Sequence, residues 1–184
     1  MGAAAERSAG AVTIERLDEV GAQAALGGLA ALLADAVDHG ASVNFLAGLT
    51  MAEAAAFWAG QIPAVADGMR QIFVARDEAG AIVGSVVLTF APQPNGPHRA
   101  EIGKMLVHSR LRRRGLGRAL LDTAEAAARA AGRTMLMLDT ATGSAGEALY
   151  RGCGWIELGT MPDHSLSTDG VLSAATFFYK RIAP

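Results

Sequence analysis

The sequence predicts an α+β fold in which a mixed, mostly antiparallel sheet of about seven strands is flanked by about four helices. The first reason is the order of the hydrophobic patterns, which run strand, two helices, three strands, helix, strand, helix and two strands. The second is the turn sequence at residues 77–80, which joins two antiparallel strands as a hairpin. The third is an amphipathic helix between the strand patterns at 101–107 and 134–140, because a helical crossover places two strands parallel to one another.

The N-terminal part of the chain is predicted to contain the first strand and two helices. Residues 11–17 roughly alternate apolar and polar, and residues 18–39 place their larger apolar side chains along one side. A pair of glycines at 27–28 is expected to break or bend this first helix. Thr50 is a good N-cap for the second helix, and Glu53 completes a capping box with it.

The middle of the chain is predicted to form a three-stranded meander. Pro63 interrupts or restarts the preceding helix, and residues 71–76 and 81–90 then form the two strands of the hairpin. The third strand, at residues 101–107, is mostly apolar and bounded by polar residues, which is typical of a half-buried strand. A basic turn follows it, and helical periodicity begins at Leu116.

The C-terminal part is predicted to add strands on the far side of this helix. Gly132 ends the helix, and residues 134–140 are a near-continuous apolar run, which is typical of a buried strand. Ser144 opens a short helix. The last two strands and the polar loop between them are expected at residues 153–160, 174–182 and 161–172.

The composition indicates a globular protein. The chain has 184 residues, of which 51% are hydrophobic and 18% are charged, and this is enough to bury a core. We expect a single domain over residues 11–184, after a flexible tail at residues 1–10. The formal net charge of −2 argues against non-specific nucleic-acid binding, which requires a basic face.

Several absences bear on location and on metal binding. A lone cysteine, Cys153, permits no internal disulfide framework and suits a reducing compartment. The first residues lack the pattern of a signal peptide, and no stretch reaches the roughly 18 consecutive apolar residues of a membrane span. We therefore expect a cytoplasmic protein. His39, His98, His108 and His164 show no ligand spacing, so no metal is expected.

The basic turn and the start of the following helix are predicted to hold an anion. The first turn of a helix presents unpaired backbone N–H groups and the positive end of the helix dipole. Gly115 and Gly117 let the backbone approach the anion, and the arginines at 112–118 add charge and forked hydrogen bonds. A pyrophosphate is the simplest ligand for this arrangement. The alternative is a solvated basic turn that only caps the helix.

Three kinds of cofactor compete for this site. A Walker P-loop requires G-x-x-x-x-G-K-[ST], which the chain lacks, and a dinucleotide fold requires a third glycine where Leu120 stands. The string Arg112-x-x-Gly115-x-Gly117 resembles the [QR]-x-x-G-x-[GA] signature of the GNAT acetyltransferases, which bind coenzyme A. The order of elements from about residue 11 onward is also similar to the GNAT fold.

Three further blocks resemble one type of GNAT enzyme. They are H-G-A-S-V-N-F in the early loop, P-N-G-P-H-R-A-E before the central strand and L-D-T-A-T-G-S-A-G-E-A-L-Y after the long helix. Together they are similar to the tabtoxin-resistance acetyltransferases of pseudomonads, which transfer an acetyl group from acetyl-CoA to a β-lactam amino-acid toxin. Loops such as residues 161–172 usually select the acceptor, and this loop shares little with that family. The sequence therefore leaves the acceptor open.

The resemblance implies that acetyl-CoA is the cosubstrate and that mainly the backbone holds it. The pantetheine arm would lie beside the central strand, and the pyrophosphate would lie on the N–H groups of the basic turn and the first helical turn. The residues implied are Met105, Leu106, Val107, Arg112, Arg113, Arg114, Gly115, Leu116, Gly117, Arg118 and Ala119.

Direct acetyl transfer to an amine requires a general base. An alkylammonium with a pKa of about 10.4 must lose a proton before it attacks the thioester. The resemblance implies that Glu101, which opens the central strand, and Asp139, which closes the next parallel strand, both face the acceptor. Spacing alone is equally compatible with an exposed strand-end acid and a turn cap.

The same reaction requires an oxyanion donor and a general acid. Backbone N–H groups near Leu106 would stabilise the oxyanion. Tyr150 ends the short helix after Asp139, where this family places the acid that protonates the leaving thiolate. The alternative for Tyr150 is that its ring packs on the long helix with its hydroxyl in solvent.

The sequence thus predicts an acetyl-CoA-dependent transferase that acetylates the amine or hydroxyl of a small amino-acid-like acceptor, with a β-lactam toxin as one candidate. A protein or peptide N-terminal acetyltransferase is the alternative enzyme and would need a shallow, acidic, open groove. A non-catalytic acyl-CoA-binding sensor is a further alternative, and a nucleic-acid-binding module is the weakest. An exposed sheet edge and the apolar loop at 43–49 also predict a homodimer.

Overall fold

A computed structural model describes residues 12–183 of the chain. The predicted tail at residues 1–10 therefore lies outside the described residues. The elements are β1 (Thr13–Leu17), α1 (Glu19–Ala24), α2 (Leu26–Asp38), α3 (Met51–Ala59), α4 (Ile62–Ala66), β2 (Arg70–Arg76), β3 (Ile82–Phe90), β4 (Arg99–Val107), a 3-10 turn (Ser109–Leu111), α5 (Leu116–Ala130), β5 (Met135–Ala141), α6 (Ala145–Gly152), β6 (Ile156–Leu166) and β7 (Leu172–Arg181).

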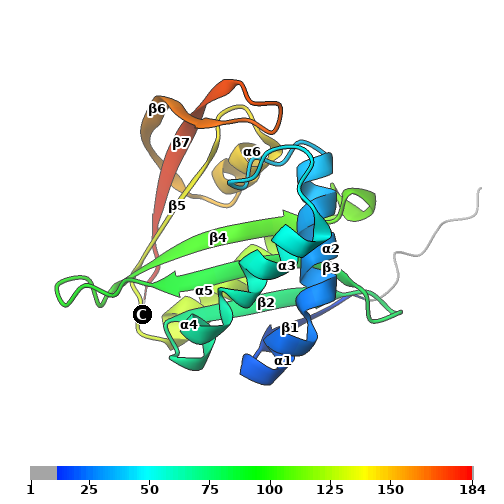
Figure 1. The fold of residues 1–184 in the computed structure, drawn as a ribbon. Helices are drawn as coiled ribbons and strands as arrows, with labels where there is room; N and C mark the ends of the chain where they lie inside the picture. Colours follow the sequence, from blue (N-terminus) through cyan, green and yellow to red (C-terminus); the bar gives the residue numbers. More distant parts are fainter. Residues whose placement is uncertain (1–11, 184) are drawn as a thin grey trace, which may run out of the picture.

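The strands form one seven-stranded sheet in the order β1-β2-β3-β4-β5-β7-β6 (Figure 1). Neighbouring strands are antiparallel except β4 and β5, which are parallel and joined through α5. This confirms the predicted α+β class, the strand number and the parallel pair. The parallel pair matters because it places the chemistry-bearing ends of β4 and β5 beside each other.

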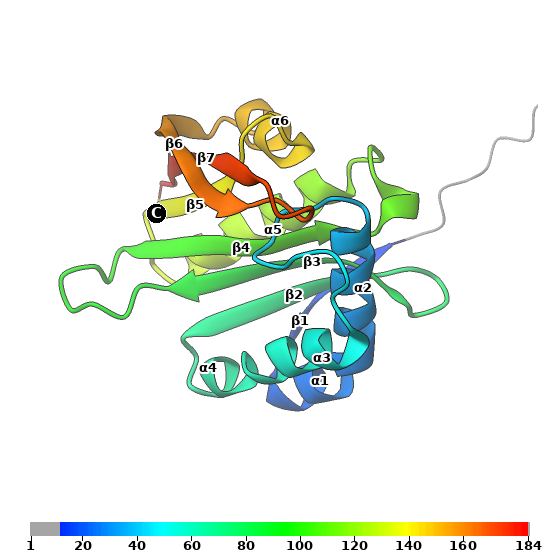
Figure 2. The ribbon, with the colours of Figure 1, turned by 45° about the horizontal axis from the view of Figure 1, so that its top comes forward.

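Helices cover both faces of the sheet (Figure 2). Helices α1–α4 pack on one face around a core that includes Leu29, Leu33, Trp58 and Ile72. Helices α5 and α6 pack on the other face. The buried residues of that second core include Leu88, Ile102, Leu120, Leu121, Leu136, Tyr150 and Phe178.

One buried carboxylate ties α5 to the C-terminal strands. Glu125 lies on the packed side of α5 and is only 3% exposed. It accepts hydrogen bonds from Trp155 Nε1 at 3.1 Å and from Lys180 Nζ at 2.8 Å. A buried charge of this kind is tolerated because it is paired and hydrogen-bonded.

The predicted helical segments are present but subdivided. The segment at 18–39 is split at Ala25 into α1 and α2. Gly27 and Gly28, which were expected to break or bend the helix, lie instead within the first turn of α2. The predicted capping box of Thr50 and Glu53 begins α3, and Pro63 lies in the first turn of α4. None of the helices in the described part of the chain is long and apolar enough to cross a bilayer.

The predicted polar loop at residues 161–172 is wrong. Strand β6 continues to Leu166, and β7 already begins at Leu172. Pairing with β7 is irregular between Met161 and Ser165, so β6 bends without ending there. The segment is polar because β6 is the edge strand and most of its side chains face solvent, which hides a strand from a hydrophobic pattern.

Candidate active site

Strands β4 and β5 separate part of the way along their length (Figure 1). They pair only where residues 99–101 lie beside residues 135–137. Beyond that point no pairing between them occurs in the described part of the chain. Parallel strands that diverge expose backbone N–H and C=O groups along the edge of each, and these groups are available to a ligand.

A β-bulge in β4 contributes to this divergence. Leu106 pairs with Ser85 and Gly103 pairs with Val87, so two residues of β4 oppose one residue of β3. One of the two, Lys104, has a positive φ of 44°. The buried Ser85 hydroxyl donates to the Lys104 carbonyl at 2.9 Å, which holds the bulge in place.

The backbone direction after the bulge decides which amides of β4 face the gap between β4 and β5. The His108 N–H donates to the Val83 carbonyl at 2.9 Å, so alternation directs the Leu106 amide toward β3 as well. Val107 faces the other way, and its carbonyl accepts a 3.3 Å hydrogen bond from Arg112 Nε. The amide of Val107, one residue beyond the predicted position, therefore faces the opening.

The N-terminus of α5 is an uncapped helix end. Gly115, with a φ of 83°, precedes the helix, and no side chain caps it. The Ala119 N–H makes the first bond, to the Gly115 carbonyl at 3.1 Å. The N–H groups of residues 113–118 have no acceptor within residues 12–183. Four or more free amides at the positive end of a long helix suit a pyrophosphate.

Gly117 packs closely against α6 at this helix end. A Cβ at Gly117 would lie 3.2 Å from Leu149 Cδ2, which is tighter than nine in ten real contacts of this kind, so the Leu149 side chain would have to shift by a few tenths of an ångström. At Gly115 the space is open, and the positive φ alone favours glycine. The two glycines of the predicted signature therefore have different physical reasons.

The arginines of the turn divide into two groups. The Arg112 guanidinium donates to the carbonyls of Val107 and His39, and Arg118 donates to the Gly152 carbonyl at 2.8 Å. These two side chains hold the turn against β4, α2 and α6. Arg113 and Arg114 are exposed and make no such contacts among the described residues. They are the cations that remain free to meet a phosphate.

The predicted carboxylates lie on the same face of the sheet. Glu101 is directly opposite Met137, and Asp139 follows Met137 by two residues, so their side chains point the same way. Ala100 and Ile102 pack under α5, which places Glu101 on the face covered by α1–α4. The pKa of Glu101 is raised by burial and by the negative charge of Asp139, although Arg70 and Lys104 oppose the rise.

Two cations that sequence reasoning missed lie beside these carboxylates. The Arg70 guanidinium donates from Nε to Thr89 Oγ1 at 3.1 Å and from a second nitrogen to Gln61 Oε1. Lys104 Nζ lies 5.1 Å from the centre of the Phe57 ring. Burial lowers the pKa of Lys104, and Arg70 adds to this, while Asp139 and Glu101 act against it. A charged residue inside an otherwise apolar strand was the available signal for Lys104.

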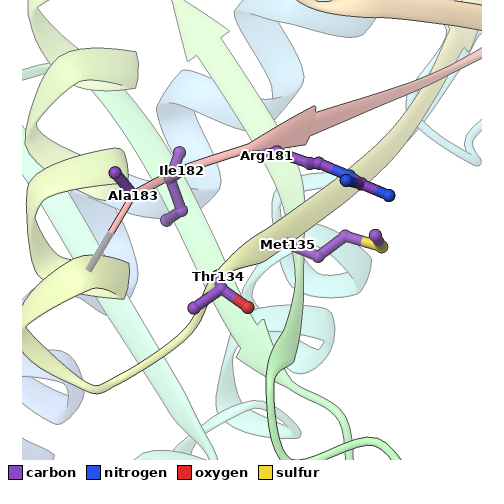
Figure 3. Close-up of a pocket in the computed structure, with 5 residues that line it drawn as sticks. All are labelled: Thr134, Met135, Arg181, Ile182 and Ala183. Carbon is purple, nitrogen blue, oxygen red and sulfur yellow. The ribbon is translucent and has the colours of Figure 1, made fainter.

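A small hollow opens next to Glu101. Its volume is about 230 Å³. It is lined by Thr89, Phe90, Ala91, Pro92, Gln93, Arg99, Ala100, Glu101 and Met137. Another hollow, of about 520 Å³, lies at the N-terminal end of β5 between Thr134, Met135, Arg181, Ile182 and Ala183 (Figure 3). The larger hollow contains none of the predicted site residues.

A hydrogen bond joins the loop before α3 to the β6–β7 turn. The Ala47 N–H, in the loop before α3, donates to the Thr168 carbonyl in the β6–β7 turn at 2.8 Å. Both ribbon views show these two loops side by side (Figures 1 and 2). Phe45 of the same loop packs edge-on against Phe57 at 5.3 Å, whereas Leu46 is exposed. The apolar early loop thus packs in part, against α3 and the β6–β7 turn.

Tyr150 approaches from the other face of the sheet. Its ring is 6% exposed and packs against Trp155 at 5.8 Å and Phe178 at 6.1 Å. Burial, with a smaller effect of Asp139, raises the pKa of the Tyr150 phenol well above its ordinary value, so the hydroxyl keeps its proton at neutral pH. The ring packs in the core, but the residue is buried, whereas the packing alternative expected the hydroxyl in solvent. The charge of Asp139 also raises the pKa of the hydroxyl.

The free amides at the start of α5, beside two parallel strands that separate, suit a cofactor that contains a diphosphate. The model of the acetyltransferase (GNAT) family matches residues 50–155, which is more than half of the chain. The chain therefore belongs to the acetyltransferase (GNAT) family. It is an acyltransferase, and acetyl-CoA is its cosubstrate.

Solved structures of similar fold agree with this assignment. A phosphinothricin acetyltransferase from Sinorhizobium meliloti, in complex with acetyl-CoA, has a TM-score of 0.76 at 20% identity, covering 94% of this chain and 89% of that one. The Salmonella typhimurium protein yncA, with its cofactor acetyl-CoA, has a TM-score of 0.74 at 20% identity, covering 94% and 95%. A ribosomal-protein-alanine N-acetyltransferase from Brucella melitensis has a TM-score of 0.70 at 26% identity, covering 92% and 99%.

Proposed function

We propose that this enzyme acetylates the amine of a small, amino-acid-like acceptor that binds on the α1–α4 face of the sheet, where β4 and β5 separate. The observation that carries the proposal is the meeting of Glu101 and Asp139 at this point, beside a hollow of about 230 Å³. Two carboxylates can bind an ammonium group and then accept its proton, directly or through a water molecule.

The remaining parts of the reaction fall to groups around the separated strands. Glu101 and Asp139 act together as the base, and Tyr150 acts as the acid that returns a proton to the leaving thiolate. A phenol held in its neutral form is suited to that role, since it can donate a proton at neutral pH. The Val107 amide, which faces the opening, is the donor best placed to stabilise negative charge on the thioester oxygen.

Acetyl-CoA would be held mainly by backbone groups. The free amides of residues 113–118 would receive its pyrophosphate, with Arg113 and Arg114 adding charge. Its pantetheine arm would lie along Met105, Leu106 and Val107 at the unpaired edge of β4. What the bound thioester supplies is an activated acetyl group next to Glu101 and Asp139.

The hydrogen bond between the early loop and the β6–β7 turn favours a small acceptor over a polypeptide. The Brucella melitensis neighbour is named as an enzyme of ribosomal-protein alanine, which keeps a peptide acceptor as the second candidate. A polypeptide would need an open groove, but the bond between Ala47 and Thr168 joins the two loops that would flank it. The three blocks that resemble tabtoxin-resistance enzymes support an acceptor such as a β-lactam amino acid.

The test is an acceptor screen that follows release of free thiol from acetyl-CoA. Amino acids, β-lactam amino acids, polyamines and short peptides with free N-termini are compared at equal concentration. We expect turnover with amino-acid-like amines, loss of about 10²-fold or more in kcat for Glu101→Gln, and unchanged coenzyme A affinity in that variant. Turnover confined to peptides, or binding of acetyl-CoA without turnover on any amine, would instead support the peptide enzyme or the sensor.

Oligomeric state and compartment are parts of the same proposal. The edge strand β6 exposes apolar side chains, including Ile156 at 51% and Leu158 at 69%. We propose that this edge pairs with a second copy in a cytoplasmic homodimer. Sedimentation equilibrium that gives a monomer at micromolar concentration would exclude the dimer.

A further inference from the structure

The acceptor side contains four charged side chains that do not pair with one another. Glu101 and Asp139 are anions, and Arg70 and Lys104 are cations. None of the ion pairs in the described part of the chain joins any two of them. Arg70 and Glu101 lie opposite Thr89 on the two sides of β3, and Asp139 follows by two the residue opposite Glu101. The bulge turns Lys104 toward Phe57 on the same side, so all four side chains lie on one face of the sheet. Opposite charges that lie near one another without pairing can each pair with a ligand that has both a positive and a negative group.

Arg70 is oriented by the protein but not fully used by it. Thr89 and Gln61 each take one of its N–H groups, and Gln61 is itself anchored by a 2.9 Å hydrogen bond to the Phe57 carbonyl. The other N–H donors of this guanidinium have no acceptor among residues 12–183. A guanidinium held in one plane with free donors is suited to a carboxylate.

Lys104 stands out among the basic residues of the chain. Lys104 and Lys180 are the sequence's two lysines. Lys180 donates to the Glu125 carboxylate and to the Cys153 carbonyl, and is thereby satisfied. Lys104 Nζ makes neither a hydrogen bond nor an ion pair with any described residue, and its contact is the face of the Phe57 ring. A half-buried ammonium without an anionic partner is costly unless a ligand supplies the anion.

The bulge explains why Lys104 points into this space. Side chains of a regular strand alternate between the two faces of the sheet, so a regular β4 would place Lys104 on the face opposite to that of Gly103, under α5. The left-handed backbone at Lys104, held by the Ser85 hydroxyl, turns its side chain instead toward Phe57 of α3. The same irregularity that opens β4 toward the cofactor therefore also delivers a cation to the acceptor side.

We propose that Lys104 and Arg70 form the binding site for a carboxylate of the acceptor, so that the enzyme selects zwitterionic amino acids. The inference rests on the function proposed above. The acceptor's ammonium lies at Glu101 and Asp139, and its carboxylate accepts hydrogen bonds from the Lys104 ammonium and the free donors of Arg70. An amine without a carboxylate would leave both cations unpaired, and this gives the site its selectivity.

The experiment compares each amino acid that is a substrate with its own carboxamide, which keeps the amine and side chain but lacks the negative charge. For the wild-type enzyme we expect kcat/KM for the acid to exceed that for the amide by about tenfold or more. Lys104→Met should remove this preference by lowering kcat/KM for the acid alone, mainly through KM. Lys104→Arg should restore most of it.

Arg76→Met is the matched control. Arg76 lies on β2 like Arg70, but at the other end of the strand, where it pairs with Glu15 at 2.6 Å. This variant loses the same charge and should keep the acid preference of the wild-type enzyme. Melting curves for all variants separate a folding defect from a binding defect.

Two results would overturn the inference. One is an equal kcat/KM of the wild-type enzyme for amino acids and their carboxamides. This result can be obtained without any variant. The other is a folded Lys104→Met enzyme that loses the same factor on both. Either result leaves the acetyltransfer activity intact, whereas an enzyme that acetylates no small amine at all would contradict the proposed function itself.

Discussion

At the scale of single residues, we propose that Glu101 and Asp139 share the role of the general base. Burial and the charge of Asp139 raise the pKa of Glu101, while Arg70 and Lys104 limit the rise. A base with a raised pKa accepts a proton more readily but is protonated, and therefore inactive, over a wider range of acidic pH. The pH at which kcat/KM falls on the acidic side of its profile, the acidic limb, therefore depends on the charges around Glu101 and Asp139.

We predict that Asp139→Asn moves this limb. The raised pKa of Glu101 means that kcat/KM falls as the pH drops through a value above that of an ordinary glutamate. Removing the Asp139 charge removes one cause of the rise, so the limb should shift to lower pH. A pH profile of kcat/KM for both enzymes measures the shift. Loss of activity at every pH would show instead that Asp139 is the indispensable base.

We also predict that Tyr150→Phe separates packing from chemistry. The Phe ring can keep the contacts with Trp155 and Phe178, so the melting temperature should change little. The loss of the hydroxyl should lower kcat by about 10²-fold if Tyr150 is the general acid. Acetylation rates with acetyl donors of lower thiol pKa provide the check, because a better leaving group should reduce the defect. A rate equal to that of the wild-type enzyme would reduce Tyr150 to a packing residue.

At the scale of elements, α5 is defined by two left-handed glycines. Gly115 precedes the helix with a φ of 83°, and Gly132 follows it with a φ of 72°. Neither glycine has a neighbour within 4 Å of an added Cβ. A side chain would therefore meet the same backbone strain and the same free space at both positions, but only Gly115 belongs to the proposed pyrophosphate site.

We predict that alanine at these two positions costs similar stability but has different effects on binding. An alanine forced into this conformation costs about 1–2 kcal/mol, so both variants should melt at lower temperature than the wild type. Only Gly115→Ala should weaken acetyl-CoA binding, by about tenfold, because it disturbs the orientation of the free amides. Isothermal calorimetry on both variants measures the difference. Equal weakening would point to a general loss of order rather than to the site.

Elements differ in how well their patterns predict them. The capping box at Thr50 and Glu53 and the stop at Gly132 are local, so the chain within one turn determines them. Strand β6 was missed beyond residue 160, because an exposed edge strand needs no apolar alternation and is held by its pairing with β7.

At the scale of the whole molecule, the proposed cofactor site joins the two halves of the sheet. Strand β4 leads into the basic turn and α5, while β5, β6 and β7 stand beyond the separation. The turn is further tied to α2, because the Ser109 N–H and hydroxyl donate to the Asp35 carboxylate at 2.8 and 2.7 Å. A ligand that bridges these parts should stabilise the folded protein as a unit.

We predict that acetyl-CoA raises the melting temperature. At a concentration of 100 times Kd, binding to the folded state alone contributes about 2.7 kcal/mol. For a chain of this size that corresponds to a shift of about 5–10 °C. Differential scanning fluorimetry with and without acetyl-CoA measures it, and adenosine alone serves as a control that lacks the pyrophosphate. An unchanged melting temperature at saturating acetyl-CoA would contradict the cofactor site.

Local sequence patterns predict the order of the elements, the parallel pair across α5 and the glycine-containing turn, because hydrophobic periodicity, caps and breakers act over a few neighbouring residues. The sequence also indicated Glu101, Asp139 and Tyr150 as candidates. The position of Lys104 on the same face as Arg70, at the proposed acceptor side, depends on the folded chain, since a bulge held by Ser85 of another strand turns Lys104 there. Contacts between residues far apart in the chain depend on strand register and backbone irregularity, which a local pattern does not contain.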